Sequence, residues 1–296
     1  MLEIKPYLKG DQMSQQSQQQ QVQASSLSNR KLGQDVDKFL SNITRKVSGV
    51  QTGIEKLDKQ LLGLAGFFAI LGEPKACKST FAMQLAVHNA KLGNPVLFID
   101  QENGKQRLSE RLLCHLHDQT WSTVRQMEGL REKYQGLSKL PLYFSFGKIE
   151  MHNIEALVEE MTQLHPGKRA LVIVDSLQSV ARNLADLRMS VDQWLLDLDA
   201  MKLKYDGQLS IGIVCEKRRG TYGEASVDAA KESGRIEYKV EQQLDMRNTG
   251  EQIIIECTLN RDGPRGMKVP LRKALKDINN EHSFMFKLEA ESGIFD

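Results

Sequence analysis

The 296-residue chain is long enough for one large α/β domain with extensions, because the buried fraction of a chain rises with its length. Charged residues make up 26% yet nearly balance at a net charge of +2, which excludes polyanion binding through net charge alone. The four cysteines lack C-x-x-C spacing and no apolar run reaches membrane-spanning length, so we expect a cytoplasmic protein without disulfides, structural zinc or membrane contact.

Two segments precede the folded part of the chain. Residues 1–30 are predicted to be a disordered tail, because the stretch 11–29 holds almost only Gln, Ser and small residues. Residues 31–48 are predicted to be a linker helix with an apolar stripe at spacings of three and four, formed by Val36, Phe39, Leu40, Ile43 and Val47. This stripe would dock either on its own domain or on a neighbouring subunit. Residues 49–296 are predicted to form one domain.

From Gly66 onward, short apolar runs alternate with helical patterns. Near-continuous apolar runs of this kind predict buried parallel strands covered by helices on both faces, here at residues 67–71, 95–100, 140–146, 170–175 and 209–214. The C-terminal part contains strand-like segments joined by turns, at residues 238–246, 251–260, 267–275 and 282–289. These predict antiparallel strands that extend the sheet. The expected fold class is therefore α/β, with a mostly parallel central sheet and antiparallel C-terminal strands.

The segment GEPKACKST (residues 72–80) matches the Walker pattern G-x-x-x-x-G-K-[ST] except that Cys77 replaces the second glycine. A Walker loop lies between a buried strand and a helix, whose N-terminus attracts phosphate, and both patterns flank this segment. We expect Lys78 to reach the β- and γ-phosphates of ATP, Ser79 to hold Mg²⁺, and Lys75 to add positive charge. The predicted ATP-binding residues of the loop are Gly72, Glu73, Pro74, Lys75, Ala76, Cys77, Lys78, Ser79 and Thr80.

Cys77 is expected to weaken nucleotide binding without abolishing it. If the position requires a positive φ, a Cβ costs about 1–2 kcal/mol. Each charge-assisted hydrogen bond to the phosphates contributes roughly 1.5–3 kcal/mol in return. The thiol is either a small-residue replacement or, beside Lys78 and a helix N-terminus, an oxidation-sensitive group.

Two more apolar runs end in acidic residues. VLFIDQEN places Asp100 and Glu102 at the carboxyl edge of the predicted sheet, where ligands bind in open α/β folds. A carboxylate at this edge can orient and deprotonate an attacking water. ALVIVDSLQSV ends its apolar run at Asp175, in the form of a Walker B aspartate that supports Mg²⁺.

In this order the motifs resemble those of the DnaB-type replicative helicases, within the RecA-like ATPases, over about residues 35–290. The segments that carry the resemblance are GVQTGIEKLDKQLLGLAG, the P-loop, KLGNPVLFIDQE, LSERLL, LVIVDSLQSV, ESGRIEYKVEQQLDM and LNRDGPRG. The resemblance implies a RecA-like P-loop NTPase fold, ATP and Mg²⁺ as cofactors, and a homohexameric ring. It also implies 5′–3′ helicase activity on single-stranded DNA in replication, together with other replication proteins.

The resemblance also assigns roles to single residues. It implies that Glu102 is the catalytic glutamate, that Asp175 is the Walker B acid, and that Arg261 is an arginine finger for a neighbour's nucleotide. Glu216 takes the position of the family's γ-phosphate-sensing glutamine. Because the helix before the family's RecA-like domain packs on the adjacent subunit, the resemblance favours inter-subunit docking of the 31–48 helix.

Two basic segments are candidates for DNA contact. EKRRGTYGE (216–224) follows a predicted strand, and AAKESGRIEY (229–238) matches the central DNA-binding loop of the family. Such residues contact the phosphate backbone rather than base edges. The predicted DNA-binding residues are Lys217, Arg218, Arg219, Lys231, Gly234 and Arg235.

The sequence departs from the family in four places. Cys77 and Glu216 replace the usual glycine and glutamine, and Leu259 stands where a second basic finger is common. The family's N-terminal domain has no counterpart, so primase coupling is not implied. Two hypotheses follow. One is a ring helicase driven by ATP hydrolysis; the other is a RecA-like ATP-binding mediator or regulator on DNA with little or no hydrolysis.

Overall fold

The computed structural model describes residues 49–296 except 118, 120, 181–186, 206, 219–221, 223–234, 251, 274–287 and 291–296. The contacts of the chain divide it between Lys46 and Val47, and only the second unit, Val47–Asp296, contains described residues. The predicted tail (1–30) and the predicted linker helix (31–48) therefore lie outside the described residues.

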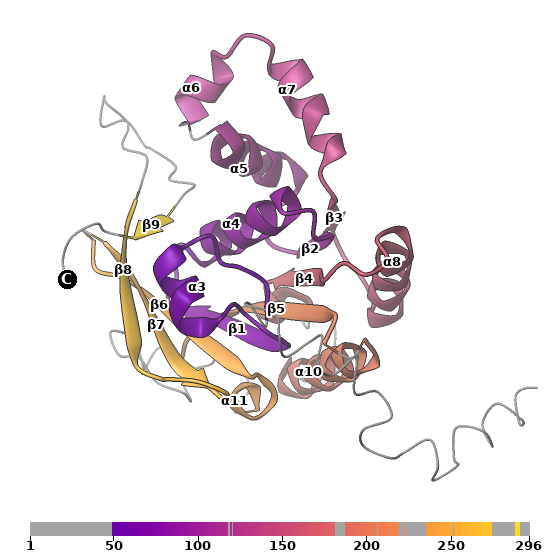
Figure 1. Ribbon diagram of the computed structural model, residues 1–296, viewed down its shortest axis with the longest axis vertical. Coiled ribbons are helices and arrows are strands. Elements are labelled where there is room, and N and C mark those ends of the chain that lie inside the picture. The colour runs from indigo at the N-terminus through magenta and orange to yellow at the C-terminus, as the bar shows by residue number, and fades with distance from the viewer. Residues whose placement is uncertain are drawn as a thin grey trace, which may run out of the picture. The chain divides into compact units, whose positions relative to one another are not determined.

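The centre of the described unit is a sheet with the strand order β3-β2-β4-β5-β1-β6-β7-β8-β9 (Figure 1). The strands β1 to β6 run parallel, and β7, β8 and β9 are each antiparallel to their neighbours. The expected α/β fold class, with antiparallel C-terminal strands, is confirmed. The bounds are β1 (Phe67–Gly72), β2 (Val96–Asp100), β3 (Leu142–Phe146), β4 (Ala170–Asp175), β5 (Leu209–Glu216), β6 (Gln242–Asn248), β7 (Ile253–Asn260), β8 (Met267–Lys273) and β9 (Leu288–Ala290).

The prediction for residues 238–246 was wrong in strand direction. β6 pairs parallel with β1 and antiparallel with β7. A parallel neighbour requires a crossover that returns the chain to the other end of the sheet. The chain makes this crossover between β5 and β6, and of its described residues 236–239 form the short helix α11 (Ile236–Lys239) before β6. The antiparallel part of the sheet therefore begins one strand later than predicted.

Helices cover both faces of the sheet, because apolar side chains of the parallel strands point alternately to either side. Phe68 and Ile70 of β1 pack with Phe81 of α4, whereas Phe67 and Ala69 pack in a second core with α8 and α10 (Figure 1). Among the described helices, none is both long and apolar enough to cross a membrane. The helices are α3 (Glu55–Leu61), α4 (Lys78–Lys91), α5 (Lys105–His117), α6 (Trp121–Arg125), α7 (Leu130–Gly136), η2 (Leu137–Lys139), α8 (Met151–Leu164), α9 (Leu177–Val180), α10 (Leu187–Lys204) and α11.

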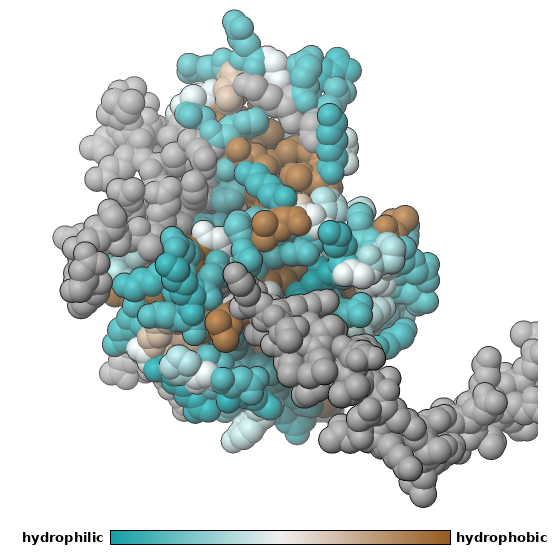
Figure 2. Space-filling model, in the orientation of Figure 1, coloured by the Kyte–Doolittle hydropathy of each residue, from teal (hydrophilic) through white to brown (hydrophobic). Residues whose placement is uncertain are grey.

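A small third core lies between α5 and the α6–α7 segment. Leu113 and Cys114 of α5 and Val124 of α6 are its buried members, and Leu130 packs against them. Figure 2 shows brown, apolar surface at this place, surrounded by teal.

The predicted functional segments meet at the ends of the parallel strands. Asp100 is the register partner of Asp175, and Gly72 is that of Glu216.

Candidate nucleotide-binding site

The loop between β1 and α4 has the backbone that a phosphate-binding loop needs. A Cβ at Gly72 would lie 2.6 Å from the carbonyl oxygen of Met246, so only glycine fits against β6. Lys75 and Cys77 both have positive φ, at 66° and 63°. The side-chain amide of Asn248 donates to the carbonyl oxygen of Lys75 at 3.2 Å and so attaches the loop to β6. The backbone of the loop is therefore held in place by contacts with β6 at both Gly72 and Lys75.

Cys77 has the backbone of the glycine that it replaces. It is the N-cap of α4 with φ 63° and ψ 24°, and its side chain makes no capping hydrogen bond. A left-handed conformation costs a residue with a Cβ about 1–2 kcal/mol. Because no side chain caps α4 at this position, its first backbone N–H groups remain suited to a phosphate.

Replacing Cys77 with Gly is expected to raise the free energy of unfolding by about 0.5–1 kcal/mol. This is the relieved strain of about 1–2 kcal/mol minus the entropy that glycine gains in the unfolded state. Urea unfolding of the nucleotide-free protein measures the change. Cys77→Ala is the matched control, because it removes the sulfur but keeps the Cβ. Equal stability of the Gly and Ala variants would show that the backbone at this position is not strained.

Lys78 is held inside the loop by backbone carbonyl groups. Its Nζ donates to the carbonyl oxygens of Gly72 at 3.0 Å and of Glu73 at 2.9 Å. Burial lowers the pKa of this ammonium group, and the carboxylates of Glu216, Asp175 and Glu102 act against the shift. An ammonium group that is partly desolvated attracts phosphate oxygens more strongly than a hydrated one.

A cavity of about 620 Å³ opens beside this loop, at the carboxyl edge of β1, β2, β4 and β5. Its volume lies within the usual range for a small-molecule or cofactor site. Gly72 and Glu73 are not part of its lining and instead supply the carbonyl groups that hold Lys78. The predicted residues that line it are Pro74, Lys75, Ala76, Cys77, Lys78, Ser79, Thr80, Glu102, Asp175 and Glu216.

Two buried aspartates end neighbouring strands and have opposite surroundings. Asp100 accepts hydrogen bonds from the backbone N–H groups of Asn103 at 3.2 Å and Gly104 at 2.6 Å, and from the Asn103 side chain at 2.9 Å. Neither carboxylate oxygen of Asp175 has a well-formed hydrogen bond with the described residues. Asp100 therefore shapes the turn that carries Glu102, whereas the Asp175 carboxylate remains available to bind a ligand.

Burial raises the pKa of Asp175 to about 6; the neighbouring Ser79 hydroxyl acts against this shift, and the Glu102 carboxylate adds to it. Ser79 and Asp175 both line the cavity, and their hydroxyl and carboxylate oxygens are ligands of the kind that Mg²⁺ prefers. A buried carboxylate without partners is costly unless a cation or proton balances it. The residues at this point therefore fit a magnesium ion.

The sequence interpretation missed five residues of the cavity lining, namely Asn103, Arg107, Arg111, Ser176 and Val214. Nη1 of Arg111 donates to the side-chain oxygen of Asn103 at 2.9 Å, which connects α5 to the turn that carries Glu102. Burial lowers the pKa of Arg111, with a further contribution from Arg107. Both arginines lie four residues apart on α5 and hence on one helical face. In the sequence, this four-residue spacing of two arginines shortly after VLFIDQEN was the signal that α5 contributes to the site.

A family model described as "AAA domain" matches residues 36–211. The chain belongs to this family. The matched region of this AAA domain protein contains the P-loop, Glu102 and Asp175, and ends within β5 before Glu216. No curated protein sequence matches the chain.

Solved structures show the same fold at low sequence identity. One, described as an ATPase domain, is 19% identical with a TM-score of 0.71, over 82% of this chain and 96% of that one. A DnaB-like replicative helicase, solved in a study of its interactions with primase, is 18% identical with a TM-score of 0.69, over 82% of this chain and 64% of that one. A KaiC-like protein, PH0186 from Pyrococcus horikoshii OT3, is 18% identical with a TM-score of 0.54, over 77% and 95%. The predicted resemblance of the fold to that of DnaB-type ATPase domains is confirmed.

Arg261 of this AAA domain protein lies outside the lining of the P-loop cavity. It directly follows β7, and its Nε donates to the carbonyl oxygen of Val240 at 3.1 Å. Its Nη2 donates to the carbonyl oxygen of Tyr238. Because an arginine finger acts on a neighbouring subunit, this position within one chain does not test the predicted role.

Lys217 is not a DNA contact in this structure, so this prediction was wrong. Its side chain has 0% exposure, and its Nζ lies 2.8 Å from Oδ2 of Asp245, which is equally buried. Asp245 lies on β6 beside the end of β1, and the backbone N–H of Lys217 donates to the carbonyl oxygen of Gly72. The lysine follows β5 directly and turns inward, because a buried aspartate needs a cation. The sequence signal for this pairing was Asp245, an acidic residue within the predicted strand 238–246.

The other predicted DNA contacts divide into two groups. Arg218 is exposed, and Arg235 is 61% exposed with an ion pair to Asp192 of α10 at 3.3 Å. Both stay predictions as DNA contacts. Arg219, Lys231 and Gly234 lie outside the described residues.

Proposed function

We propose that this chain is an Mg²⁺-dependent ATPase motor of the DnaB-like helicase type, which translocates along single-stranded DNA as a homohexameric ring in DNA replication. The observation that carries the proposal is the cavity at the carboxyl edge of the sheet. It brings Lys78, Glu102 and the buried carboxylate of Asp175, beside the Ser79 hydroxyl, to one place at a helix N-terminus. The fold it lies in also occurs in two proteins described as an ATPase domain and as a DnaB-like replicative helicase.

Each residue has a distinct task in this proposal. The backbone N–H groups of the P-loop and Lys78 bind the phosphates, and Ser79 and Asp175 hold Mg²⁺. The bound Mg²⁺ would balance charge on the β- and γ-phosphate oxygens. Glu102 orients the attacking water and accepts its proton. It is exposed in the cavity, on the turn fixed by Asp100 and Asn103, so it can face a water beside the γ-phosphate.

The remaining predicted residues act between subunits or on DNA. Arg261 stabilises charge on the nucleotide of a neighbouring subunit, and the 31–48 helix docks on that neighbour. Arg218 and Arg235, with Arg219, Lys231 and Gly234, contact the DNA backbone. Binding should weaken with salt at a slope of about 0.7 per neutralised phosphate. None of the four cysteines, all in the described part of the chain, forms a disulfide, which supports a cytoplasmic location with other replication proteins as partners.

The test is ATP turnover with and without single-stranded DNA. We expect DNA to stimulate turnover, and we expect Glu102→Gln to lower the stimulated rate by roughly 10²-fold or more, since that is the usual contribution of a general base. The variant should still bind Mg-ATP in a calorimetric titration. Glu155→Gln is the matched control, because Glu155 is an exposed acid of α8 outside the cavity lining. An ATP turnover rate that changes neither with single-stranded DNA nor with the Glu102 substitution would contradict the proposal.

A second candidate is a RecA-like mediator or regulator that binds ATP on DNA with little or no hydrolysis. Glu216 favours it, because its carboxylate lines the cavity and is the strongest electrostatic influence on Lys78 among the surrounding acids. An acid at this position repels a γ-phosphate and competes with it for the lysine. Mg-ATP binding without measurable turnover, in the presence of single-stranded DNA, would favour this candidate.

A further inference from the structure

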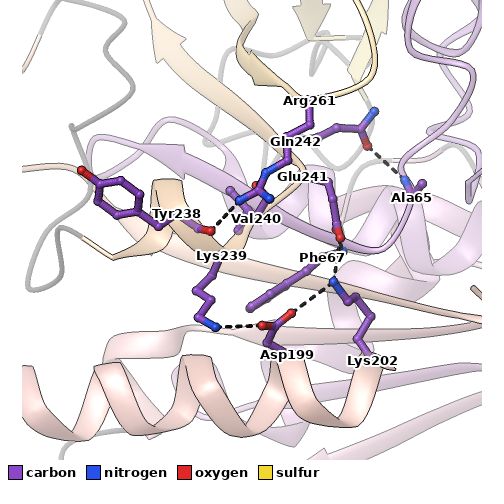
Figure 3. Close-up of polar contacts among 10 residues, drawn as sticks. All are labelled: Ala65, Phe67, Asp199, Lys202, Tyr238, Lys239, Val240, Glu241, Gln242 and Arg261. Atoms are coloured by element: carbon purple, nitrogen blue, oxygen red, sulfur yellow. Dashed lines mark hydrogen bonds and ion pairs between the residues drawn. The ribbon is translucent and has the colours of Figure 1, made fainter. Parts of the chain in front are cut away.

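The side chain of Arg261 is seated on the backbone of its own chain. Its Nε donates to the carbonyl oxygen of Val240 at 3.1 Å, and its Nη2 donates to that of Tyr238 (Figure 3). Its backbone N–H donates to the carbonyl oxygen of Glu241 at 2.9 Å. We call these three carbonyl groups the Arg261 cradle. A guanidinium has five N–H donors, so the two side-chain bonds leave others for phosphate oxygens.

A chain of ion pairs holds the cradle against α10. Nζ of Lys239, at the end of α11, lies 2.9 Å from Oδ2 of Asp199, and Oδ1 of Asp199 lies 3.1 Å from Nζ of Lys202. Nζ of Lys202 in turn lies 2.6 Å from Oε1 of Glu241. Figure 3 shows Asp199 between the two lysines, on the helix that runs beside the cradle. Asp199 is therefore connected to both ends of the segment 239–241.

At Glu241, the series of ion pairs is attached to β1, the strand that leads into the P-loop. Oε2 of Glu241 accepts a hydrogen bond from the backbone N–H of Phe67. Gly66 has φ +57°, and a Cβ there would lie 2.2 Å from the same carboxylate oxygen. The side chains of Lys202 and Asp199 are only 13% and 18% exposed, so their attraction is screened less than that of a surface pair.

The pKa values in the cluster agree with this arrangement. Burial alone would raise the pKa of Asp199, but the hydrogen bonds from Lys239 and Lys202 outweigh burial and lower it. Burial likewise opposes the charge of Lys202, and the carboxylates of Glu241 and Asp199 raise its pKa. The shifts of Asp199 and Lys202 therefore both favour the charged forms, which attract each other.

We propose that Asp199 is a positioning residue for Arg261. By holding Lys239 and Lys202, it fixes the segment 238–241, in which the carbonyl groups of Tyr238 and Val240 order the guanidinium before it meets a phosphate. An arginine side chain that is already ordered loses less rotamer freedom when it binds. The inference rests on the proposed function, in which Arg261 acts on the nucleotide of a neighbouring subunit.

The experiment measures ATP turnover of the full chain with single-stranded DNA, in Asp199→Asn, Arg261→Ala and the double variant. We expect Asp199→Asn to lower kcat about tenfold with KM unchanged within about twofold, because only an interaction in the transition state is lost. In the Arg261→Ala background the same substitution should lower kcat less than about twofold further. Lys239→Met, which removes one ion pair of the chain, should give a smaller loss in the same direction.

Glu256→Gln is the matched control. Glu256 on β7 is 12% exposed and also pairs with two cations, Arg247 at 2.7 Å and Lys268 at 3.6 Å, without contacting the cradle. It should leave kcat unchanged. An equal fall of kcat in Glu256→Gln, or an equal effect of Asp199→Asn with and without Arg261, would overturn the proposal, because the loss would then be a general effect of destabilisation.

Amide hydrogen exchange separates this inference from the proposed function. Asp199→Asn should accelerate exchange in the segment 236–241 about tenfold or more, whereas Glu256→Gln should not. Unchanged exchange would refute the positioning role whatever the activity. Accelerated exchange with full turnover in Arg261→Ala would instead refute the role of Arg261 in hydrolysis, and would leave Asp199 as the residue that orders its side chain.

Discussion

Lys217→Met is expected to lower the free energy of unfolding by about 3–5 kcal/mol, the usual cost of leaving one charge of a buried pair uncompensated. Lys217 and Asp245 both have 0% exposure, and their charged atoms lie 2.8 Å apart. The methionine fills a similar volume, so the loss comes from removing the positive charge beside the buried Asp245 carboxylate rather than from a cavity. Urea unfolding near pH 7.5 measures the change.

Two control variants make this result specific. Arg218→Met changes the next residue, which is exposed, and should alter stability by less than about 0.5 kcal/mol. The double variant Lys217→Met with Asp245→Leu removes both charges and should recover most of the loss. If Lys217→Met instead kept full stability and weakened binding to single-stranded DNA, the buried pair would be refuted and Lys217 would return to the DNA contacts.

Asp175→Asn is expected to have opposite effects on stability and on nucleotide binding. The folded-state pKa of Asp175 is about 6, against an ordinary value of 3.8, so the carboxyl group favours its protonated form. It destabilises the nucleotide-free protein progressively as pH rises from about 3.8 through about 6, by up to about 3 kcal/mol above that range. Asparagine should remove much of this penalty near pH 8 and little of it near pH 4. Its affinity for Mg-ATP should fall more than about tenfold, because the anionic ligand is lost.

Unfolding curves at pH 8 and pH 4, with a calorimetric Mg-ATP titration, test both parts of this expectation. Asp100→Asn is the matched control, since Asp100 is the register partner of Asp175 and is also 1% exposed. Its carboxylate accepts several hydrogen bonds from Asn103 and Gly104, so its neutralisation should lower stability by about 1–3 kcal/mol at pH 8. A loss of stability in both variants would show that Asp175 has partners that its geometry does not provide.

The pH dependence of nucleotide binding has the same origin. Holding Mg²⁺ requires the ionised carboxylate, so the affinity of the unmodified protein for Mg-ATP should fall as pH is lowered through about 6. If Asp175 is the magnesium ligand, the fall should disappear in Asp175→Asn. The decisive comparison is therefore the slope of affinity against pH in the two proteins.

Local features of the P-loop could be predicted because they depend on neighbours in sequence. The apolar run of β1, the helical pattern from Lys78 and the missing glycine at Cys77 were sufficient to predict a strand, a helix and a positive φ between them. The parallel core was equally accessible, since apolar side chains on both strand faces indicate a sheet covered by helices. The direction of β6 was not, because the same alternation suits parallel and antiparallel neighbours.

The roles of charged residues depended on contacts between distant segments. Asp100 and Asp175 both end an apolar run, and only the hydrogen bonds to Asp100 separate a structural acid from a candidate magnesium ligand. Lys217 belongs to a basic cluster in sequence, yet Asp245 draws it into the interior. Arg107 and Arg111 share a helical face that the sequence indicates, but only the folded structure shows that this face lines the cavity.

The sequence by itself therefore determined the α/β class, the P-loop with its unusual Cys77, and the order of the motifs, since these follow from periodicity and local backbone preference. Tertiary structure alone decided which ionisable groups are buried, which are paired and which face the cavity. The physical reason is that the charge state and partners of a side chain depend on desolvation and on groups that chain folding brings near it. These groups lie tens to hundreds of residues away, as Lys202 does from Glu241 and Ala65 from Gln242.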